Sequence, residues 1–204
     1  FPIRALVNPM TFSNSGNLGM TIALFAFGSL GLELAVIYFM ITSLLHFTVG
    51  QSIWSGKWSI KILLKTPVLL AVIAGILVNF SDIGLPKTLT NTTSILAGIT
   101  IPLLLFTMGI SINKIQFKIE PKIIILIIIR IIIASSLAYI ICSILDINGI
   151  AKNIILLQGV LPAPIFTYLF ASKFNVHPHI VANYLMSSTF ISLFTITIFL
   201  TLIL

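Results

Sequence analysis

The feature that most constrains this sequence is an apolar run that is long enough to cross a membrane and has prolines near its middle. The run contains the segment QGVLPAPIFTYLFASKFN, residues 158–175, with Gly159, Pro162 and Pro164 inside it. Proline removes a backbone donor and clashes with the carbonyl four residues earlier, so the helix is expected to open there. Opened backbone is tolerated at membrane depth only where protein or a water-filled cavity receives the freed polar groups. The run therefore predicts a binding site at mid-membrane depth.

The composition indicates an all-α polytopic membrane protein. Hydrophobic residues make up 58% of the chain and charged residues only 7%, far fewer than a soluble domain carries. The net charge of +7 comes from basic residues scattered among loops and span ends, which favours orientation in a lipid bilayer over nucleic-acid binding. The single cysteine, Cys142, excludes a disulfide framework within the chain. We expect no cofactor and no metal, because His177 and His179 flank Pro178 in a geometry unsuited to shared ligation.

Seven apolar segments are expected to cross the membrane, judged by run length and by glycine, proline and charge punctuation. They cover residues 11–28, 33–50, 67–80, 92–112, 122–145, 153–172 and 179–204. Lysine-rich connections alternate with nearly neutral ones, and the positive-inside rule places the lysine-rich ones in the cytoplasm. The sequence therefore predicts a multi-pass protein of the cell (plasma or inner) membrane with its C-terminus outside.

The first and sixth segments are both interrupted, the first by the polar, glycine-rich residues 14–19. Set 145 positions apart, the two regions share the pairs Leu24/Leu169, Phe25/Phe170, Ala26/Ala171, Val36/Val181 and Ser43/Ser188. Five crossings separate the segments, so they should run in opposite directions, as in inverted-repeat transporters. We expect residues 1–50 to be the last two spans of a first five-span repeat, with a broken helix at 11–28. Residues 51–66 would be a cytoplasmic connection and 67–204 a complete second repeat, with a broken helix at 153–172 and three spans preceding residue 1.

Several of these segments resemble a known family of carriers. Residues 12–20, FSNSGNLGM, are similar to the first crossover of the auxin efflux carrier family, and Leu161-Pro162, Phe170-Ala171 and residues 175–178 to its second half. The family comprises plant PIN carriers and microbial relatives that include organic-acid permeases, within a bile acid/sodium symporter-like superfamily. The resemblance implies two five-span inverted repeats, broken helices that cross at the substrate site, and elevator-type alternating access for an organic anion. Microbial relatives usually have a proline just after the first crossover, where this chain has Met20-Thr21.

The cargo is expected to lie where the two broken helices cross. The candidate substrate-binding residues are Asn14, Gly16, Asn17, Gly19, Arg130, Gln158, Pro162 and Pro164. Alternatives remain for several of them. Asn14 and Asn17 could serve only the opened backbone, and Gln158 could bond either that backbone or the ligand. Arg130 could snorkel to the interface or supply positive potential for a carboxylate. His46 is interpreted as a packed or hydrogen-bonded residue.

The sequence favours a secondary carrier for a small organic anion such as a carboxylate, an auxin efflux carrier-like permease. Glu33, Asp82, Glu120 and Asp146 all fall at span edges, so the sequence gives no support for coupling to H⁺ or Na⁺. A sodium-coupled bile-acid-type symporter, a channel and a non-transporting membrane subunit remain as alternatives, and a homodimer stays open. An intramembrane enzyme is disfavoured, because the sequence has no HExxH motif and no paired aspartates at depth.

Overall fold

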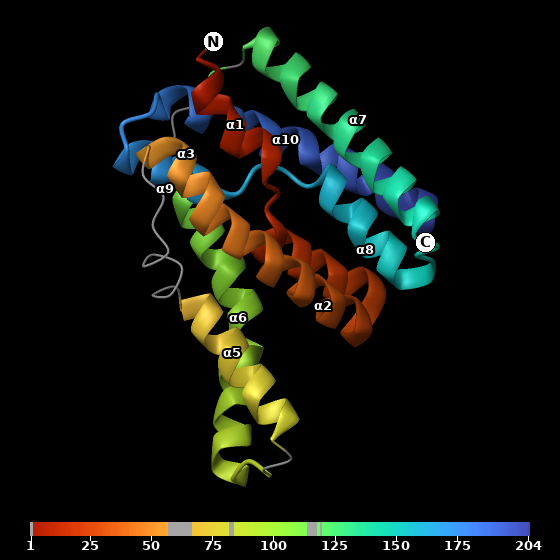
Figure 1. Cartoon of the computed structure of the whole chain (residues 1–204). Helices are drawn as coiled ribbons and strands as arrows, with labels where there is room; N and C mark the ends of the chain where they lie inside the picture. The colour runs from red at the N-terminus through yellow and green to blue at the C-terminus, as the bar shows by residue number, and fades with distance from the viewer. Residues whose placement is uncertain (1, 57–66, 82–83, 114–117, 119) are drawn as a thin grey trace.

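The computed structural model describes residues 2–56, 67–81, 84–113, 118 and 120–204, and every regular element in these residues is a helix (Figure 1). In chain order the elements are α1 (Ile3–Thr11), the π-helical turn η1 (Ser15–Gly19), α2 (Met20–Leu45), η2 (His46–Gly50), α3 (Gln51–Ser55), α5 (Pro67–Phe80), α6 (Lys87–Asn113), α7 (Pro121–Ile144), α8 (Gly149–Val160), α9 (Ile165–Lys173) and α10 (Pro178–Ile203). The lysines expected to orient the first connections, Lys57, Lys61, Lys65 and Lys114, lie outside the described residues, as does Asp82.

Four helical stretches of the described residues are long and apolar enough to cross a membrane. They are Ile3–Ser55, Lys87–Thr107, Pro121–Ile144 and Pro178–Ile203. The pair α8 and α9 adds a fifth if it is counted as one bent span, and α5 is a shorter apolar helix. The fold is therefore that of a multi-pass, all-helical membrane protein.

The first of these stretches is a hairpin, because Gly28 interrupts α2. Gly28 has φ 69° and ψ −158°, a backbone conformation that residues other than glycine rarely adopt, and the chain reverses there (Figure 1). Gly31 permits the tight return, since a Cβ on it would lie 2.6 Å from the carbonyl oxygen of Ala23. Farther along, the hydroxyls of Ser15 and Thr42 are 3.2 Å apart across the two limbs. The predicted segments 11–28 and 33–50 correspond to these limbs.

The bounds of both segments need correction, because helix extends beyond them. The first limb is preceded by α1, and the second continues through η2 and α3 to Ser55, inside the predicted connection 51–66. Residues of α3 and η2 accept hydrogen bonds from the polar side chains of α1. Arg4 donates to the carbonyls of Ile53 and Trp54, and the Trp54 indole donates to the carbonyl of Arg4 at 2.6 Å. Asn8 donates to the carbonyl of Gly50 at 2.8 Å.

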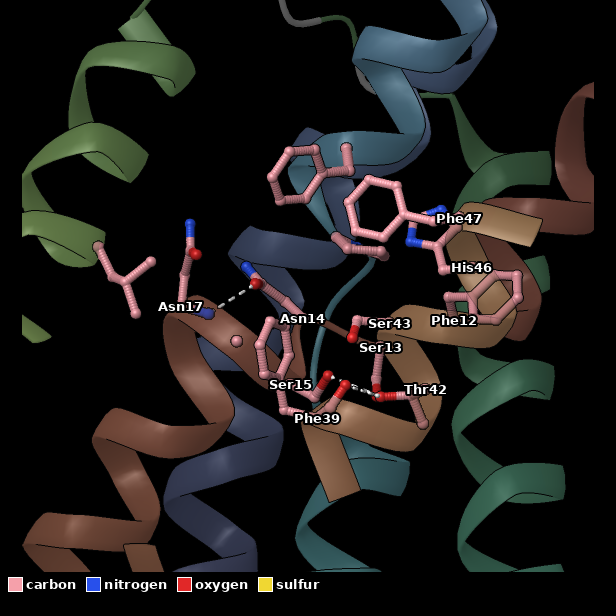
Figure 2. Close-up of a pocket in the computed structure, with 14 residues that line it drawn as sticks. Phe12, Ser13, Asn14, Ser15, Asn17, Phe39, Thr42, Ser43, His46 and Phe47 are labelled. Atoms are coloured by element: carbon pink, nitrogen blue, oxygen red, sulfur yellow. Dashed lines mark hydrogen bonds between the residues drawn. The ribbon is translucent and has the colours of Figure 1, made fainter. Parts of the chain in front are cut away.

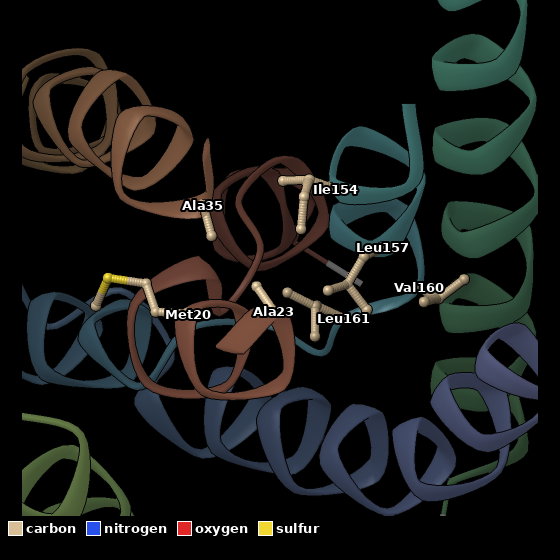
Figure 3. Close-up of a cluster of buried hydrophobic side chains, with 7 residues drawn as sticks. All are labelled: Met20, Ala23, Ala35, Ile154, Leu157, Val160 and Leu161. Carbon is tan, nitrogen blue, oxygen red and sulfur yellow. The ribbon is translucent and has the colours of Figure 1, made fainter. Parts of the chain in front are cut away.

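Most of the helices form one packed body, and α5 and α6 extend away from it (Figure 1). One buried cluster joins the start of α2 to α8 (Figure 3), and its members are Met20, Ala23, Ala35, Ile154, Leu157, Val160 and Leu161. Two further clusters join α1 to α7 and α10, and α1 to α3 and α9. By contrast, α5 and α6 expose nearly all their described side chains, including Ile95 and Phe106. Apolar side chains left exposed in this way suit a lipid environment or further protein.

Candidate functional site

The predicted opening of the sixth segment at its prolines is confirmed. Helix α8 ends at Val160, α9 begins at Ile165, and the two are bent by 45°. The residues between them are extended, and Leu161 has φ −68° and ψ 151°. Helix α10 receives part of the freed backbone, because Thr195 donates to the carbonyl of Val160 at 3.1 Å and the amide of Ala163 donates to the hydroxyl of Ser188 at 3.2 Å. Part of the opened backbone is thus stabilised by a neighbouring helix, as an apolar surrounding would require.

The interruption in the first segment lies earlier than the glycine-rich pattern predicted. The chain is non-helical at residues 12–14, whereas residues 15–19 form η1 and are helical. Asn14 decides the boundary, because its side-chain oxygen accepts from the amide of Asn17 at 3.3 Å and so caps the new helix. The offset of 145 is also wrong in detail. It would align Phe12 with Leu157, one turn before the break that begins at Leu161.

The two breaks meet directly. The amide of Asn14 donates to the carbonyl of Pro162 at 2.8 Å, which joins the unwound residues of one break to those of the other. Helix α1 packs beside α9, and α2 packs beside α8. The first half of each broken helix therefore lies next to the second half of the other. In Figure 1 the path from α1 into α2 accordingly runs against the path from α8 into α9.

Arg130 of α7 is buried at this crossing. Its Nη1 donates to the carbonyl of Gly159 at 3.2 Å and, more closely, to that of Leu161, and its Nε donates to the carbonyl of Met10 at 3.4 Å. Helices α8 and α1 both end here, and the last carbonyls of a helix lack partners within it and carry partial negative charge. Arg130 thus offsets the carbonyl ends of both broken helices and does not snorkel to the interface.

A cavity of about 180 Å³ lies beside the crossing (Figure 2). Its lining residues are Phe12, Ser13, Asn14, Ser15, Gly16, Asn17, Phe39, Thr42, Ser43, His46, Phe47, Leu104, Pro164 and Phe166. Polar side chains come from the unwound segment, η1 and the second limb of α2. Aromatic rings also line the cavity: Phe12 stacks on His46 with centroids 4.3 Å apart, and Phe47 meets Phe166 edge-on at 5.4 Å.

Four of the eight candidate residues line this cavity, namely Asn14, Gly16, Asn17 and Pro164. The other four lie close by without lining it. Gly19 sets the packing of the first limb on α8, since a Cβ on it would lie 3.1 Å from both the Gln158 side-chain oxygen and Leu161 Cδ1. Gln158 is buried, and neither atom of its amide has a hydrogen-bond partner. Pro162 is fully buried and contributes its carbonyl to the crossing.

The sequence interpretation missed the wall formed by the second limb. Thr42, Ser43 and His46 lie on this limb within one helical turn of one another, and all three line the cavity. Polar residues on one face of an otherwise apolar span were the available signal, because such residues usually face protein or a cavity. His46 was interpreted as packed or hydrogen-bonded. Its ring is indeed packed, but its Nε2 atom is buried without a partner.

The cavity can attract negative charge without a charged side chain. Among the described residues, its lining contains no lysine, arginine, aspartate or glutamate. Helices η1 and α9 both begin at the crossing, and residues at their first turns, Ser15, Gly16 and Phe166, reach the cavity. A helix N-terminus presents amide donors and partial positive charge to an anion. With Arg130 held by the carbonyl ends, these amide ends and the polar side chains of the lining are the groups that a ligand in the cavity would meet.

Comparison with known proteins agrees with this geometry. Residues 52–200 match the model of a family described as "Membrane transport protein". The chain is also 26% identical over 206 residues to a protein of Methanocaldococcus jannaschii named "Uncharacterized transporter MJ1031", an alignment that covers 96% of this chain and 67% of that protein. Because the family match covers more than half of the chain, the resemblance noted at the two breaks is confirmed, and the chain belongs to the membrane transport protein family, which is that of the auxin efflux carriers.

Proposed function

We propose that this protein is a secondary transporter that moves a small organic anion, such as a carboxylate, across the cell membrane by alternating access. The observation that carries the proposal is the hydrogen bond from the Asn14 amide to the Pro162 carbonyl, at 2.8 Å. It lies beside a cavity that is lined by the first turns of two helices. Broken helices that meet at mid-depth are the usual substrate site of secondary transporters.

The proposed architecture is a pair of five-span inverted repeats, of which this chain holds the last seven spans. The crosswise packing of α1 on α9 and of α2 on α8 supports this, because it is the packing expected of two equivalent broken helices in opposite orientations. Residues 1–50 would then close the first repeat and residues 67–204 would form the second. The C-terminus would lie outside, according to the distribution of lysines among the connections.

The proposed motion is that of an elevator, in which the packed body carries the cavity past a scaffold. The body consists of α1, α2 and α7 to α10, and α5 and α6 would belong to the scaffold. The separation of α5 and α6 from the body supports this division. Helix α6 reaches the body at η1, and its Leu104 contributes to the cavity wall. If the body slides along α6, this contact is the place where access to the cargo would open or close.

The cavity suits a carboxylate attached to a small apolar group. Ser13, Asn17 and Thr42 supply hydroxyl and amide groups, and the rings of Phe39 and Phe166 supply apolar surface. Pyruvate and phenylpyruvate form a matched pair of test cargoes, because they share the carboxylate and differ by one aromatic ring. Uptake of both is expected in liposomes that contain the purified protein, with tighter binding of phenylpyruvate if the rings contact cargo.

Asn17→Ala tests the polar wall of the cavity. Loss of one hydrogen bond to a charged cargo should raise KM about tenfold to a hundredfold. Asn148→Ala is the matched control, because Asn148 is exposed between α7 and α8 and its side chain bonds to Asp146, away from the cavity lining. Wild-type liposomes that take up neither keto acid would count against the proposal. Single-channel currents in planar bilayers would replace it with a pore, and a strict requirement for sodium would identify a sodium symporter.

A further inference from the structure

His46 is held in an unusual way at the edge of the cavity. It is 5% exposed, stacks on Phe12 with ring centroids 4.3 Å apart, and meets the edge of Phe170 at 5.5 Å. In Figure 2 its ring lies between Phe12 and Phe47. These contacts fix the imidazole plane, yet Nε2 is buried without a hydrogen-bond partner. A buried polar atom left in this state is costly, so a ligand that supplied a partner would be stabilised there.

No charged group of the described residues accompanies His46 in the cavity lining. The titratable groups carried by α1, α2 and α9 are Arg4, Glu33, Tyr38, Tyr168 and Lys173, and Arg130 of α7 lies at the adjacent crossing. Arg4 and Arg130 are bound to backbone carbonyls, Lys173 lies over the ring of Phe174, and Glu33 is exposed near the hairpin turn. Because a buried charge without a partner is expensive, the imidazole is neutral when the cavity is empty.

We propose that His46 takes up a proton together with the cargo carboxylate, so that one H⁺ accompanies each organic anion. This rests on the proposed transport function. The Nε2 lone pair accepts a proton from the aqueous side as the carboxylate enters, and the resulting N–H⁺ donates to a carboxylate oxygen. On the opposite side the anion and the proton both leave, and the imidazole returns to its neutral form. A monocarboxylate would then cross with no net charge.

The same aromatic contacts support both forms of the ring. A neutral imidazole stacks on Phe12, and an imidazolium at 4.3 Å from that ring gains a cation–π attraction. The carboxylate supplies the counter-charge that the empty cavity lacks. Protonation and cargo binding therefore stabilise each other, which is the thermodynamic requirement for coupling. Thr42 and Ser43, a turn earlier on the same limb, also line the cavity, and their hydroxyls donate to the backbone carbonyls of Tyr38 and Met40.

The test measures proton uptake on cargo binding, with purified protein in weakly buffered detergent solution containing a pH indicator. Pyruvate and phenylpyruvate stay ionised between about pH 6 and about pH 8, so any proton bound belongs to the protein. Wild-type protein should bind about one proton per keto acid, and the apparent affinity should fall about tenfold per pH unit on the alkaline side. In liposomes, cargo entry should alkalinise the outside medium.

His46→Gln should bind the keto acid more weakly, with no proton uptake and no dependence on pH. His46→Phe, which preserves the aromatic packing, provides a second variant if the first does not fold. His179→Gln is the control, because His179 is exposed at the start of α10, and it should behave as wild type. Proton uptake retained in a His46 variant, or cargo binding by wild type without a proton, would overturn the inference alone. Failure of wild type to bind or transport either keto acid would overturn the proposed function and this inference with it.

Discussion

Replacing Arg130 with methionine tests whether its role is to hold the crossing of the broken helices. Methionine is apolar and of comparable length, so Arg130→Met removes the charge and all donors while preserving most of the buried volume. The carbonyls of Gly159 and Leu161 would lose the Nη1 donor, and that of Met10 would lose a longer bond of 3.4 Å. Backbone at the two breaks has no helical hydrogen bonds to replace these contacts.

The expected loss follows from the two closer carbonyls. A buried acceptor left unpaired costs about 1–3 kcal/mol, so two of them cost about 2–6 kcal/mol. Removal of a buried guanidinium also relieves its desolvation penalty, which offsets part of this cost. We therefore expect a net loss of about 2–4 kcal/mol. For a chain of this size 1 kcal/mol corresponds to about 2–4 °C, so the melting temperature should fall by about 5–15 °C.

The assay is thermal unfolding of the purified protein in detergent, followed by size-exclusion chromatography of the fraction that remains folded. Arg130→Lys should recover part of the loss, because an ammonium keeps the charge but lacks the planar fork that reaches several carbonyls. Lys87→Met at the exposed start of α6 is the control for loss of a positive charge. The reasoning would be refuted if the Arg130→Met protein had the melting temperature of the wild type and lost only transport, since Arg130 would then act on the cargo.

Three further predictions concern close packing and hydrogen bonding. Gly159→Ala should lower the melting temperature, because its Cβ would lie 3.1 Å from the Ser135 amide nitrogen in α7, whereas Gly98→Ala, with open space around it, should not. Gly16→Ala should change the KM for keto acids and leave thermal stability nearly unaltered, since the atoms nearest to its Cβ would belong to the movable ring of Phe39, at 2.9 Å. Trp54→Phe removes the indole donor that bonds to the Arg4 carbonyl of α1 at 2.6 Å, and should lower the free energy of unfolding by about 1 kcal/mol. A Trp54→Phe protein as stable as the wild type in thermal unfolding would contradict a stabilising role for this bond.

The membrane class and one of the two breaks could be read directly from local sequence. A chain with 58% hydrophobic and 7% charged residues has too little polar surface for a soluble domain. Pro162 and Pro164 open the helix wherever it packs, because proline lacks the amide hydrogen and clashes with the preceding turn. These properties belong to the backbone and to bulk composition, and so they were predictable without knowledge of any partner.

The place of the first break was not predictable in the same way. Gly16 and Gly19 weaken a helix without ending it, and the side chain of Asn14 resolves the ambiguity by capping residues 15–19 as a helical turn. Helix α1 also lies almost wholly outside the predicted span 11–28. Its polar contacts are long-range, because exposed Arg4 and buried Asn8 donate to carbonyls of α3 and η2 that lie more than forty positions away.

Sequence alone determined that this protein is a helical membrane protein with a helix opened at its prolines, and it identified the family. Only the tertiary structure decided which side chains surround that opening. It assigned Arg130 to the carbonyl ends of two helices, brought the Asn14 amide to the Pro162 carbonyl, and turned Thr42 and His46 toward the cavity. The physical reason is range. A proline acts on the residues beside it, whereas a donor and an acceptor separated by more than a hundred residues meet only when helices pack.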